Sequence, residues 1–549
     1  MLLGGVEEAA RPRSAENQAP TSLTKRTSHR WKIVAAMGVL LVLVGGWQAW
    51  RVMYLKDSSG ASAKAPVAAM EMVPEKSIAV LPFNNRTGDR AQDFYADGLT
   101  DELTTALAHI AALKVIASNS AARFKGSDKR PSEIGRDLGV AALVTGSVLR
   151  ANGRVRYTAA LVSAESEQNL WTESYERDER DVLKLQADVA SAIAKAIAVR
   201  MSPLESKRLA DARTVNPRAF DEYLLGRALW NQRTEQSVRE ALMHFENATH
   251  MAPDFALGYA GLADSHIILG VYGFDPPHAA FPLAKAAALT AIKLDPGAGE
   301  PHASLGDIIF HYDWDWDASE REHEKAIELA PAFATAYQWG SEAQILKGDL
   351  AGALARLQRA RELDPLSMIV RTSLANVLGL LGRREEAVTE LRTAVKLNPS
   401  FPRTRRELAL QLLALGRPEE ALAAARELTK LAPDNRSAVA VLGLCLGRAG
   451  HIDEARALLR RLEGDQKETF LSSLDLARIA AGLLDQDLTI RYLERALDAR
   501  EGFLPFIGGD DEFNFLHRDA RYLAITKELG IGVSRGVTVT AMHNPGSTK

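Results

Sequence analysis

Three aspartates at alternate positions form the most conspicuous chemical motif of this 549-residue sequence. Asp313, Asp315 and Asp317 imitate the start of a calcium-binding loop, in which alternate side chains supply the first oxygen ligands. No glycine follows where such a loop must turn, and no glutamate closes it at the required spacing. We therefore predict that Asp317 and Glu320 cap a helix here, and that this segment binds no calcium.

A second acidic motif lies near the carboxyl terminus, at residues 508–513 with the sequence GGDDEF. It resembles the GGDEF signature of diguanylate cyclases but contains an additional aspartate. That chemistry also needs metal-binding carboxylates on another strand of an α/β domain, whereas only helical patterns precede this motif. We interpret residues 503–532 as a segment that caps the preceding helices. The alternative is an enzyme, acting either through this motif as a cyclase or through an unrecognised pocket in residues 76–201.

Other patterns of catalytic residues are missing from the sequence. It contains no glycine-rich phosphate-binding loop followed by lysine and no Gly-x-Ser-x-Gly elbow. His323-Glu324 lacks the second histidine of a zinc protease motif, because Ile327 stands at that position, and the twelve histidines show no ligand spacing. We predict that the chain is not an enzyme, with no catalytic residue, cofactor or metal site.

Two smaller features have both a chemical and a structural interpretation. Asp97, Asp101 and Glu102 stand at helical spacing and would suit a cation or a basic partner, but we favour the interpretation as a solvated first helical turn stabilised by the helix dipole. Cys445 is the only cysteine, so it forms no internal disulfide. It lies in an apolar run, and we expect a small core residue.

Composition excludes one broad class of function. The formal net charge is −3, with 67 basic and 70 acidic side chains, and this excludes a generally basic surface for nucleic acid. We therefore expect no nucleic-acid partner for this chain. An apolar content of 46% is ordinary for folded protein, and the length predicts three or four structural units.

Six prolines organise the second half of the chain. The last four intervals between them are 35, 34, 34 and 34 residues. A small residue usually stands five and twelve positions before each proline, and a glycine recurs at residues 348, 382, 416 and 450. A fixed period near 34 predicts a stacked array of paired helices, in which the glycines turn the first helix into the second and the prolines end the second. The prolines are Pro253, Pro296, Pro331, Pro365, Pro399 and Pro433.

These positions match the tetratricopeptide repeat (TPR) pattern, and the resemblance extends over about eight helix pairs between residues 202 and 502. It implies a superhelix with an inner groove that binds a protein or peptide partner. Matching the repeat positions places a set of side chains near that groove, and its two arginines beside an asparagine suit a carboxylate or an acidic segment. The alternative is that the arginines merely solvate a helix face. The set is Gln338, Thr372, Asn376, Arg403 and Arg406.

The amino-terminal residues predict a membrane anchor. Residues 1–32 are rich in small and polar side chains and should be a disordered cytoplasmic tail. Residues 33–50 are an uncharged run long enough to cross a lipid bilayer as a helix, and basic residues are more frequent before it than after it. We predict a single-pass protein of the bacterial inner membrane with a cytoplasmic amino terminus, a tether at 51–75 and periplasmic domains beyond it.

Residues 76–201 show a different rhythm and predict a small α/β domain. The run at 77–83 predicts a strand buried on both faces. Asn152-Gly153 between two alternating segments predicts a hairpin. The expected order is βαβαβββα, so the fold class is α+β with one transmembrane helix, this domain and an all-α superhelix.

This region also resembles a known family. The segments SIAVLPFNNRTGD, FYADGLTDELTTAL, EIGRDLGVAALVTGSV and LWTESYERDERDVLKLQ are similar to the TolB amino-terminal-like domain that bacteria place before TPR arrays. In that family a winged-helix regulator, an adenylate cyclase or a protein kinase commonly precedes the anchor, and residues 1–32 are too few for any of these. We therefore expect a scaffold or sensor whose array binds a partner, with a remnant of a transmembrane transcription regulator as a further alternative. Residues 533–549 should be a disordered tail.

Overall fold

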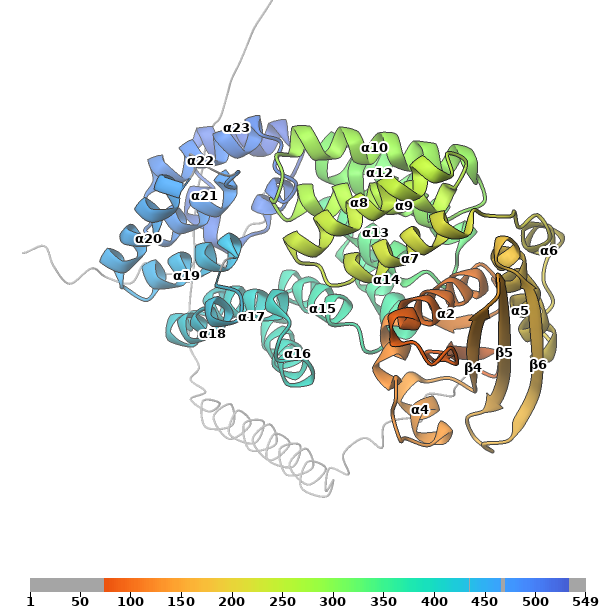
Figure 1. Ribbon diagram of the computed structural model, residues 1–549. Coiled ribbons are helices and arrows are strands. Elements are labelled where there is room, and N and C mark those ends of the chain that lie inside the picture. The colour runs from red at the N-terminus through yellow and green to blue at the C-terminus, as the bar shows by residue number, and fades with distance from the viewer. Residues whose placement is uncertain (1–73, 434, 466–469, 533–549) are drawn as a thin grey trace, which may run out of the picture. The chain divides into compact units, whose positions relative to one another are not determined.

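The computed structural model describes residues 74–433, 435–465 and 470–532 (Figure 1). The chain divides into two units, residues 1–72 and 73–549, and all described residues belong to the second. This unit contains a mixed β-sheet with its own helices, followed by a long series of helices and a short carboxyl-terminal segment.

The sheet begins with a parallel centre and continues as an antiparallel meander. Its order is β3-β1-β4-β5-β6, in which β1 is parallel to both neighbours, β2 pairs with β4, and β4, β5 and β6 are antiparallel. The predicted hairpin is confirmed, because β4 and β5 pair up to Ala151 and Arg154 around Asn152 and Gly153, both with positive φ. The strands are β1 (Ser77–Val80), β2 (Asn84–Asn85), β3 (Lys114–Ile116), β4 (Ala142–Ala151), β5 (Arg154–Ser163) and β6 (Asn169–Asp178).

Helices cover both faces of the sheet around β1. Alternate residues of β1 enter different cores: Ile78 packs with α2 and α5, whereas Ala79 packs with Ile134 of α4. Every residue of β1 is buried, which explains its continuous apolar run. The helices of this region are α2 (Asp93–Ala108), α3 (Ser118–Ala121), α4 (Pro131–Leu138), α5 (Val182–Ala196) and α6 (Pro203–Ala210).

The following helices are arranged as antiparallel neighbours. In the described residues α7 to α22 form eight successive pairs, each with a first and a second helix. They are α7 (Pro217–Trp230), α8 (Glu235–Met251), α9 (Ala256–Val271), α10 (Pro277–Leu294), α11 (Glu300–Ile308), α12 (Trp316–Leu329), α13 (Ala334–Leu346), α14 (Leu350–Leu363), α15 (Met368–Leu380), α16 (Arg384–Leu397), α17 (Pro402–Ala414), α18 (Pro418–Leu431), α19 (Arg436–Arg448), α20 (Ile452–Asp465), α21 (Ser473–Gly482) and α22 (Gln486–Asp498).

The repeat positions act as the sequence predicts. The helices α8, α10, α12, α14, α16 and α18 each end two residues before a repeat proline. The residues five and twelve positions before the prolines are all buried, Ala241 and Ala248 among them, so neighbouring helices approach closely. The turn glycines at 348, 382, 416 and 450 all have positive φ, and Arg233, Trp314 and Leu484 take the same left-handed conformation in three pairs that lack the glycine.

The carboxyl-terminal segment folds back against the array. It consists of two 3-10 turns, η5 (Leu504–Gly508) and η6 (Asp511–Leu516), and of α23 (Ala520–Glu528). Leu504, Phe513 and Tyr522 are fully buried in one apolar cluster with α21 and α22. The GGDDEF motif therefore forms turns within a packed cap, and it has no strand hairpin of the kind that the cyclase interpretation requires.

The sheet region and the array share an interface. The Ala117 amide donates a hydrogen bond to the Leu363 carbonyl (2.8 Å), and the Ser120 hydroxyl donates to Asp364. Residues of α2, α5, α7 and α8 also belong to one continuous apolar core. The sheet region is thus held on the array through the carboxyl-terminal end of α14 and the face of α7.

The predicted fold class and localisation are corrected by this structure. The described residues form a mostly helical superhelix of paired helices with a small mixed sheet domain, and none of their helices is long and apolar enough to cross a membrane. The predicted span at residues 33–50, with its contact to the lipid bilayer, lies outside the described residues. The transmembrane helix is therefore removed from the fold class, and the single-pass inner-membrane localisation is not retained.

Candidate functional site

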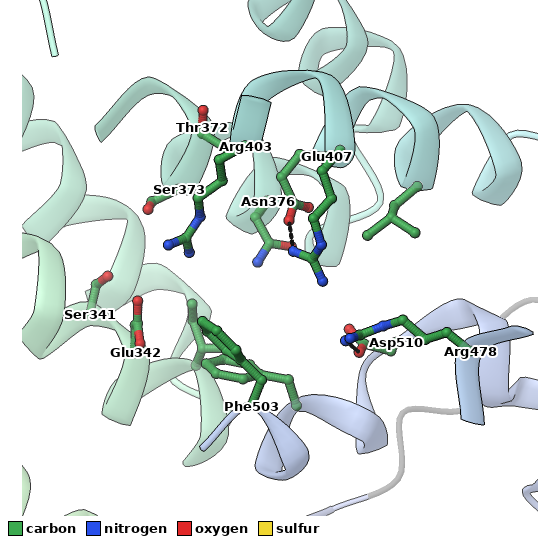
Figure 2. Close-up of a pocket in the computed structure, with 14 residues that line it drawn as sticks. Ser341, Glu342, Thr372, Ser373, Asn376, Arg403, Glu407, Arg478, Phe503 and Asp510 are labelled. Atoms are coloured by element: carbon green, nitrogen blue, oxygen red, sulfur yellow. Dashed lines mark hydrogen bonds and ion pairs between the residues drawn. The ribbon is translucent and has the colours of Figure 1, made fainter. Parts of the chain in front are cut away.

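A pocket lies between the first helices of three successive pairs and the carboxyl-terminal segment (Figure 2). We call it the groove pocket. Its cavity of about 60 Å³ is far below the roughly 300–1,000 Å³ of small-molecule sites. The lining residues are Ser341, Glu342 and Ile345 of α13, Thr372, Ser373 and Asn376 of α15, Arg403, Arg406, Glu407 and Leu410 of α17, Arg478 of α21, and Phe503, Phe506 and Asp510 of the segment.

The repeat explains why these side chains meet. Residues seven positions after a repeat proline include Gln338, Thr372 and Arg406, and residues eleven positions after include Glu342 and Asn376. Equivalent positions on stacked helices project toward the same wall, because each pair repeats the orientation of the previous one. These recurring positions supply part of the pocket lining, and α21 and the carboxyl-terminal segment supply the rest.

Four of the five residues predicted to bind a partner line the groove pocket: Thr372, Asn376, Arg403 and Arg406. Gln338 lies behind them and is buried, and its side-chain amide donates to Glu342 Oε1 (3.3 Å) and Ser373 Oγ (3.4 Å). The Thr372 hydroxyl donates to the Met368 carbonyl (2.7 Å). The structure thus places the set together, while the binding role of these residues stays a prediction.

The arginines of the pocket differ in how their charge is balanced. Arg406 contacts Glu407 (2.8 Å), but burial and the nearby Arg478 cation lower the pKa of its guanidinium. Arg403 has no ion pair with any described residue, and its guanidinium lies 5.8 Å from the ring centre of Phe503. The Nε atoms of both arginines are buried without a hydrogen-bond partner among the described residues. The pocket therefore offers arginine donors that no described residue uses.

A buried arginine closes the opposite side of the pocket. Arg478 contacts Asp475 (3.3 Å), Asp510 (3.5 Å) and Glu512 (3.2 Å), and we call these four residues the Arg478 cluster. Burial opposes the charged guanidinium, but Glu512, Asp510 and Asp475 together raise its pKa. Burial, together with the charge of Glu512, raises the pKa of Asp510 to about 8 although Arg478 and Arg406 lower it. The acidic residues of the GGDDEF motif thus serve an internal ion-pair network.

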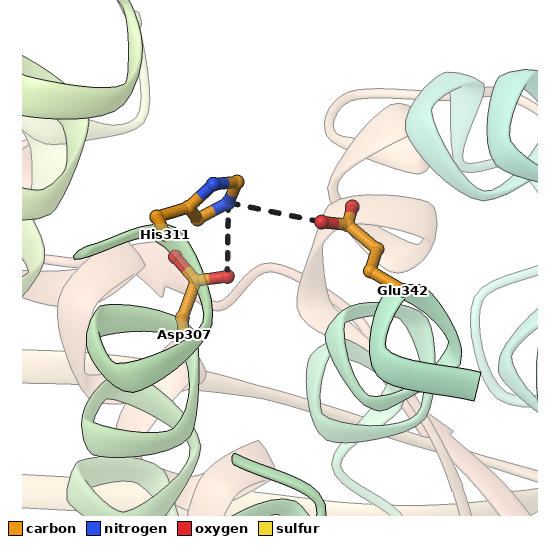
Figure 3. Close-up of side chains that lie close together, drawn as sticks. All are labelled: Asp307, His311 and Glu342. Atoms are coloured by element: carbon orange, nitrogen blue, oxygen red, sulfur yellow. Dashed lines mark ion pairs between the residues drawn. The ribbon is translucent and has the colours of Figure 1, made fainter. Parts of the chain in front are cut away.

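A second group of polar side chains lies next to the pocket and shares Glu342 with it (Figure 3). We call Asp307, His311 and Glu342 the His311 cluster. His311 Nε2 lies 3.6 Å from Asp307 Oδ1 and 3.7 Å from Glu342 Oε2, and all three side chains are buried. Burial and then the charge of Asp264 raise the pKa of Asp307 to about 8, and burial lowers the pKa of His311.

The spacing of the polar residues in the sequence contains a signal for this cluster, although it matches no histidine motif. His311 follows Asp307 by four residues, which places both on one helix face. Asp264, Asp307, Glu342 and Asn376 each stand eleven positions after a repeat proline, so polar side chains recur at one inner position in four consecutive pairs. Counting from the prolines would have found Glu342. The contact of the carboxyl-terminal segment, which supplies Phe503 and Asp510, had no sequence signal.

Three smaller predictions have different outcomes. Cys445 is a buried core residue as predicted, and burial raises the pKa of its thiol to about 12. The predicted helix cap is wrong, because Asp315 caps α12 through the Ala318 amide (2.9 Å) and Asp317 contacts Lys347 instead. The solvated helical turn is wrong for Glu102, which accepts a hydrogen bond from the Tyr223 hydroxyl (2.6 Å) in the interface with α7.

Comparison with known families identifies the repeats. Models of the tetratricopeptide repeat match residues 341–402, 372–436 and 412–469. The chain is also 33% identical over 193 residues to putative adenylate cyclase 3 of Rhizobium meliloti (strain 1021), an alignment that covers 35% of this chain. The chain spans about a third of the length of that relative, 33%.

Solved structures with similarity to this chain include other repeat proteins. Human IFIT1, as a dimer with m7Gppp-AAAA, has a TM-score of 0.43 and 14% identity, covering 63% of this chain and 76% of its own. YrrB, described as a TPR protein with an unusual peptide-binding site, has a TM-score of 0.25 and 18% identity, covering 38% and 99%. PilF of Pseudomonas aeruginosa has a TM-score of 0.29 and 18% identity, covering 41% and 99%. These similarities say nothing about what this chain binds. The family models and the helix pairs together show that the carboxyl-terminal region carries TPR repeats, and the protein is a TPR-type interaction scaffold of a kind that binds protein or peptide partners.

Proposed function

We propose that the groove pocket binds a carboxylate-bearing segment of a partner protein. The single observation that carries this proposal is the pair of arginines, Arg403 and Arg406, whose Nε atoms are buried without hydrogen-bond partners among the described residues. A buried donor without an acceptor costs free energy, and a carboxylate supplies two acceptor oxygens that match the planar guanidinium. The proposed role is therefore to recognise acidic side chains or a free carboxyl terminus.

The size and lining of the pocket favour a peptide over a small molecule. A cavity of about 60 Å³ admits a carboxylate group or a few water molecules, but not a nucleotide. The hydroxyl of Ser373 and the amide of Asn376 line the same pocket and offer further donors. Phe503 and Phe506 add an apolar floor for the aliphatic part of the same segment.

The test compares arginines on one helix. Fluorescein-labelled oligoglutamate with a free carboxyl terminus is titrated with the full-length protein, and binding is followed by fluorescence anisotropy. The double variant Arg403→Ala/Arg406→Ala should bind at least about 10-fold more weakly, because charged hydrogen bonds are lost. Arg405→Ala is the matched control, since Arg405 lies on the same helix outside the pocket lining and its guanidinium donates to the Pro399 carbonyl (3.0 Å). It should bind within about threefold of the wild type.

Two results contradict the proposal. One is equal binding by the wild type and the double variant while circular dichroism shows both to be folded. The other is equal binding of an oligolysine peptide, since that would show attraction without the arginine chemistry. Raising the salt concentration should weaken, but not abolish, the difference between the two arginine variants, because the pocket is partly buried.

The similarity to a putative adenylate cyclase favours a signalling context, and we propose that this chain serves it as a binding module with no nucleotide chemistry of its own. The sheet region at residues 76–201, which resembles the TolB amino-terminal-like domain, would be a further recognition domain within the same scaffold. Asp510 and Glu512 of the GGDDEF motif already pair with Arg478 and lie in 3-10 turns. Purified protein should turn over neither ATP nor GTP. Turnover that disappears in Asp510→Ala would favour the enzyme alternative.

A further inference from the structure

The His311 cluster has the separations of metal ligands and not those of hydrogen bonds. Its two nitrogen–oxygen distances, 3.6 Å and 3.7 Å, exceed those of N–H···O hydrogen bonds. Ligand atoms at about 2.0–2.2 Å from a tetrahedral Zn²⁺ ion lie roughly 3.3–3.6 Å from one another. One ligand atom from each residue can be chosen so that all three lie within 4.8 Å of one another. The side chains thus surround a point that an ion would fill.

The ring of His311 is held in the orientation and tautomer that a metal ligand requires. Its Nδ1 donates a hydrogen bond to the Gly502 carbonyl (2.8 Å), so Nε2 carries the lone pair and is directed at the two carboxylates. A Cβ atom at residue 502 would lie 3.2 Å from the His311 ring, so glycine permits this close approach. A backbone carbonyl on the second ring nitrogen is the usual outer contact of a metal-bound histidine.

The backbone at His311 also departs from a regular helix. After α11 the chain forms a single π-turn, η4 (Ile309–Asp313), with His311 at its centre. Such turns interrupt the hydrogen-bond ladder and recur at functional sites, because they reorient one side chain relative to its neighbours. Here the π-turn brings His311 Nε2 to Asp307 on the same helix and to Glu342 on the next pair.

The carboxylates of the cluster have little compensation from protein groups. Asp307 is 4% exposed, and the only basic side chain within ion-pair distance of it among the described residues is the neutral imidazole of His311. The neighbouring Asp264 pairs with Arg227 (3.0 Å) and accepts a hydrogen bond from the Ser304 hydroxyl (2.7 Å). Its negative charge acts on Asp307 as well. Arg233 and Arg403 act on Asp307 from beyond ion-pair distance. Buried charges are normally paired or bind metal ions, and this group contains more acid than base.

We propose that Asp307, His311 and Glu342 bind one divalent transition-metal ion, with Zn²⁺ as the first candidate. One imidazole and two carboxylates suit Zn²⁺, whereas Ca²⁺ prefers six or more oxygen ligands and Mg²⁺ retains most of its water. Three protein ligands leave a fourth position for water or for another ligand. The ion would link α11 and α13, the first helices of the third and fourth pairs. Through His311 it would also fix the position of the Gly502 carbonyl.

The experiment uses the full-length protein with any affinity tag removed. Metal is stripped with a chelator, and Zn²⁺ is titrated in competition with a chromophoric chelator. One equivalent should bind to the wild type. Asp307→Asn and Glu342→Gln keep the side-chain shape and should weaken binding by more than about 100-fold, beyond the loss seen for outer contacts. His451→Gln is the control, because the partly exposed imidazole of His451 pairs with Glu454 away from the cluster, and this variant should bind Zn²⁺ as the wild type does.

A second measurement needs no variant. Co²⁺ added to the stripped wild type should give the visible absorption of a four-coordinate site, and an equivalent of Zn²⁺ should remove it. The proposal is overturned if stripped wild type binds no stoichiometric Zn²⁺ and gives no such absorption. Equal Zn²⁺ affinity in the wild type, Asp307→Asn and Glu342→Gln also overturns it, because the ion would then sit elsewhere.

Discussion

The inner wall of the array contains two buried ionic clusters that solve the same problem differently. In the Arg478 cluster a guanidinium lies between three carboxylates at 3.2–3.5 Å, so the protein supplies both signs of charge. In the His311 cluster two carboxylates face a neutral imidazole at 3.6–3.7 Å, and no lysine or arginine in the described part of the chain lies within ion-pair distance of them. The first arrangement joins α21 to the carboxyl-terminal segment. The second is complete only when a cation joins it.

The groove pocket lies between these two clusters and shows the opposite imbalance. The Nε atoms of Arg403 and Arg406 have no acceptor among the described residues, whereas the carboxylates of the His311 cluster have no lysine or arginine within ion-pair distance among them. Burial alone therefore does not identify a binding site in this protein. The informative property is charge that the chain itself leaves unmatched.

The largest effect is expected from breaking the matched cluster. Arg478→Met removes the cation and leaves the buried Asp475 and Glu512 beside the partly exposed Asp510, which should lower the free energy of unfolding by about 3–5 kcal/mol. Urea unfolding followed by circular dichroism measures this loss. If the loss is below about 1 kcal/mol, the cluster is not the internal support that the comparison assumes.

An intermediate effect on stability is expected for Asp364. This buried carboxylate accepts hydrogen bonds from serine hydroxyls and has no ion pair among the described residues. Burial raises its pKa to about 6, against lowering by hydrogen bonds from Ser120 and Ser367. The folded state then prefers the protonated acid, so this contribution to stability is present below about pH 4 and is lost as pH rises through about 6. Asp364→Asn should remove up to about 3 kcal/mol of this pH dependence between pH 4 and 6.

The control for that measurement is Asp97→Asn. Asp97 is exposed and pairs with Lys125 at 2.6 Å, so its removal should change stability by less than about 1 kcal/mol and leave the pH profile intact. Thermal unfolding at several pH values distinguishes the two variants. An unchanged profile in Asp364→Asn would assign the pH dependence to other carboxyl groups.

A smaller effect is expected from disturbing the contact behind His311. Gly502→Ala places a methyl group 3.2 Å from the imidazole ring, which must shift by a few tenths of an ångström. We expect a loss of about 1–2 kcal/mol in stability from this overpacking, and a weaker Zn²⁺ affinity by about 10–100-fold because the ring is displaced. Gly532→Ala is the matched control, since no atom lies within 4 Å of an added Cβ there. Unchanged Zn²⁺ affinity in Gly502→Ala would show that this carbonyl does not orient the ring.

The smallest effect on stability is expected from the unmatched arginine. Arg403→Met removes a guanidinium that lies 5.8 Å from the ring centre of Phe503 and has no ion pair among the described residues, so the free energy of unfolding should change by less than about 1 kcal/mol. The same substitution should weaken oligoglutamate binding severalfold. A large loss of stability would mean that Arg403 is a structural cation like Arg478.

The repeat architecture was predictable because it depends on local chemistry. Proline ends a helix, glycine accepts positive φ, and alanine permits close packing. The roles of Pro331, Gly348 and Ala326 could therefore be predicted from residue type alone. The hairpin at Asn152-Gly153 was predictable for the same reason. Four of the predicted pocket residues were found because positions of the first helix recur about every 34 residues.

The features that depend on distant contacts could not be read from the sequence. Glu102 looks like part of a solvated helical turn until α7 covers it with Tyr223. Arg478 and Asp510 are 32 residues apart with no common pattern, and their contact exists only because the carboxyl-terminal segment returns to the array. The π-turn at His311 likewise has no sequence rule, since it depends on how the next pair packs.

The return of the carboxyl-terminal end to early helices also changes how the array should melt. His278 Nε2 lies 3.2 Å from the Asp498 carbonyl, and the Arg500 guanidinium donates to the Tyr312 carbonyl (2.6 Å), contacts that span about 190–220 residues of chain. An open solenoid has only nearest-neighbour interfaces and frays from its ends. Here these contacts join the last pair to the second and third pairs, so the last pair cannot unfold before they break. We therefore expect these repeats to unfold in a single cooperative step.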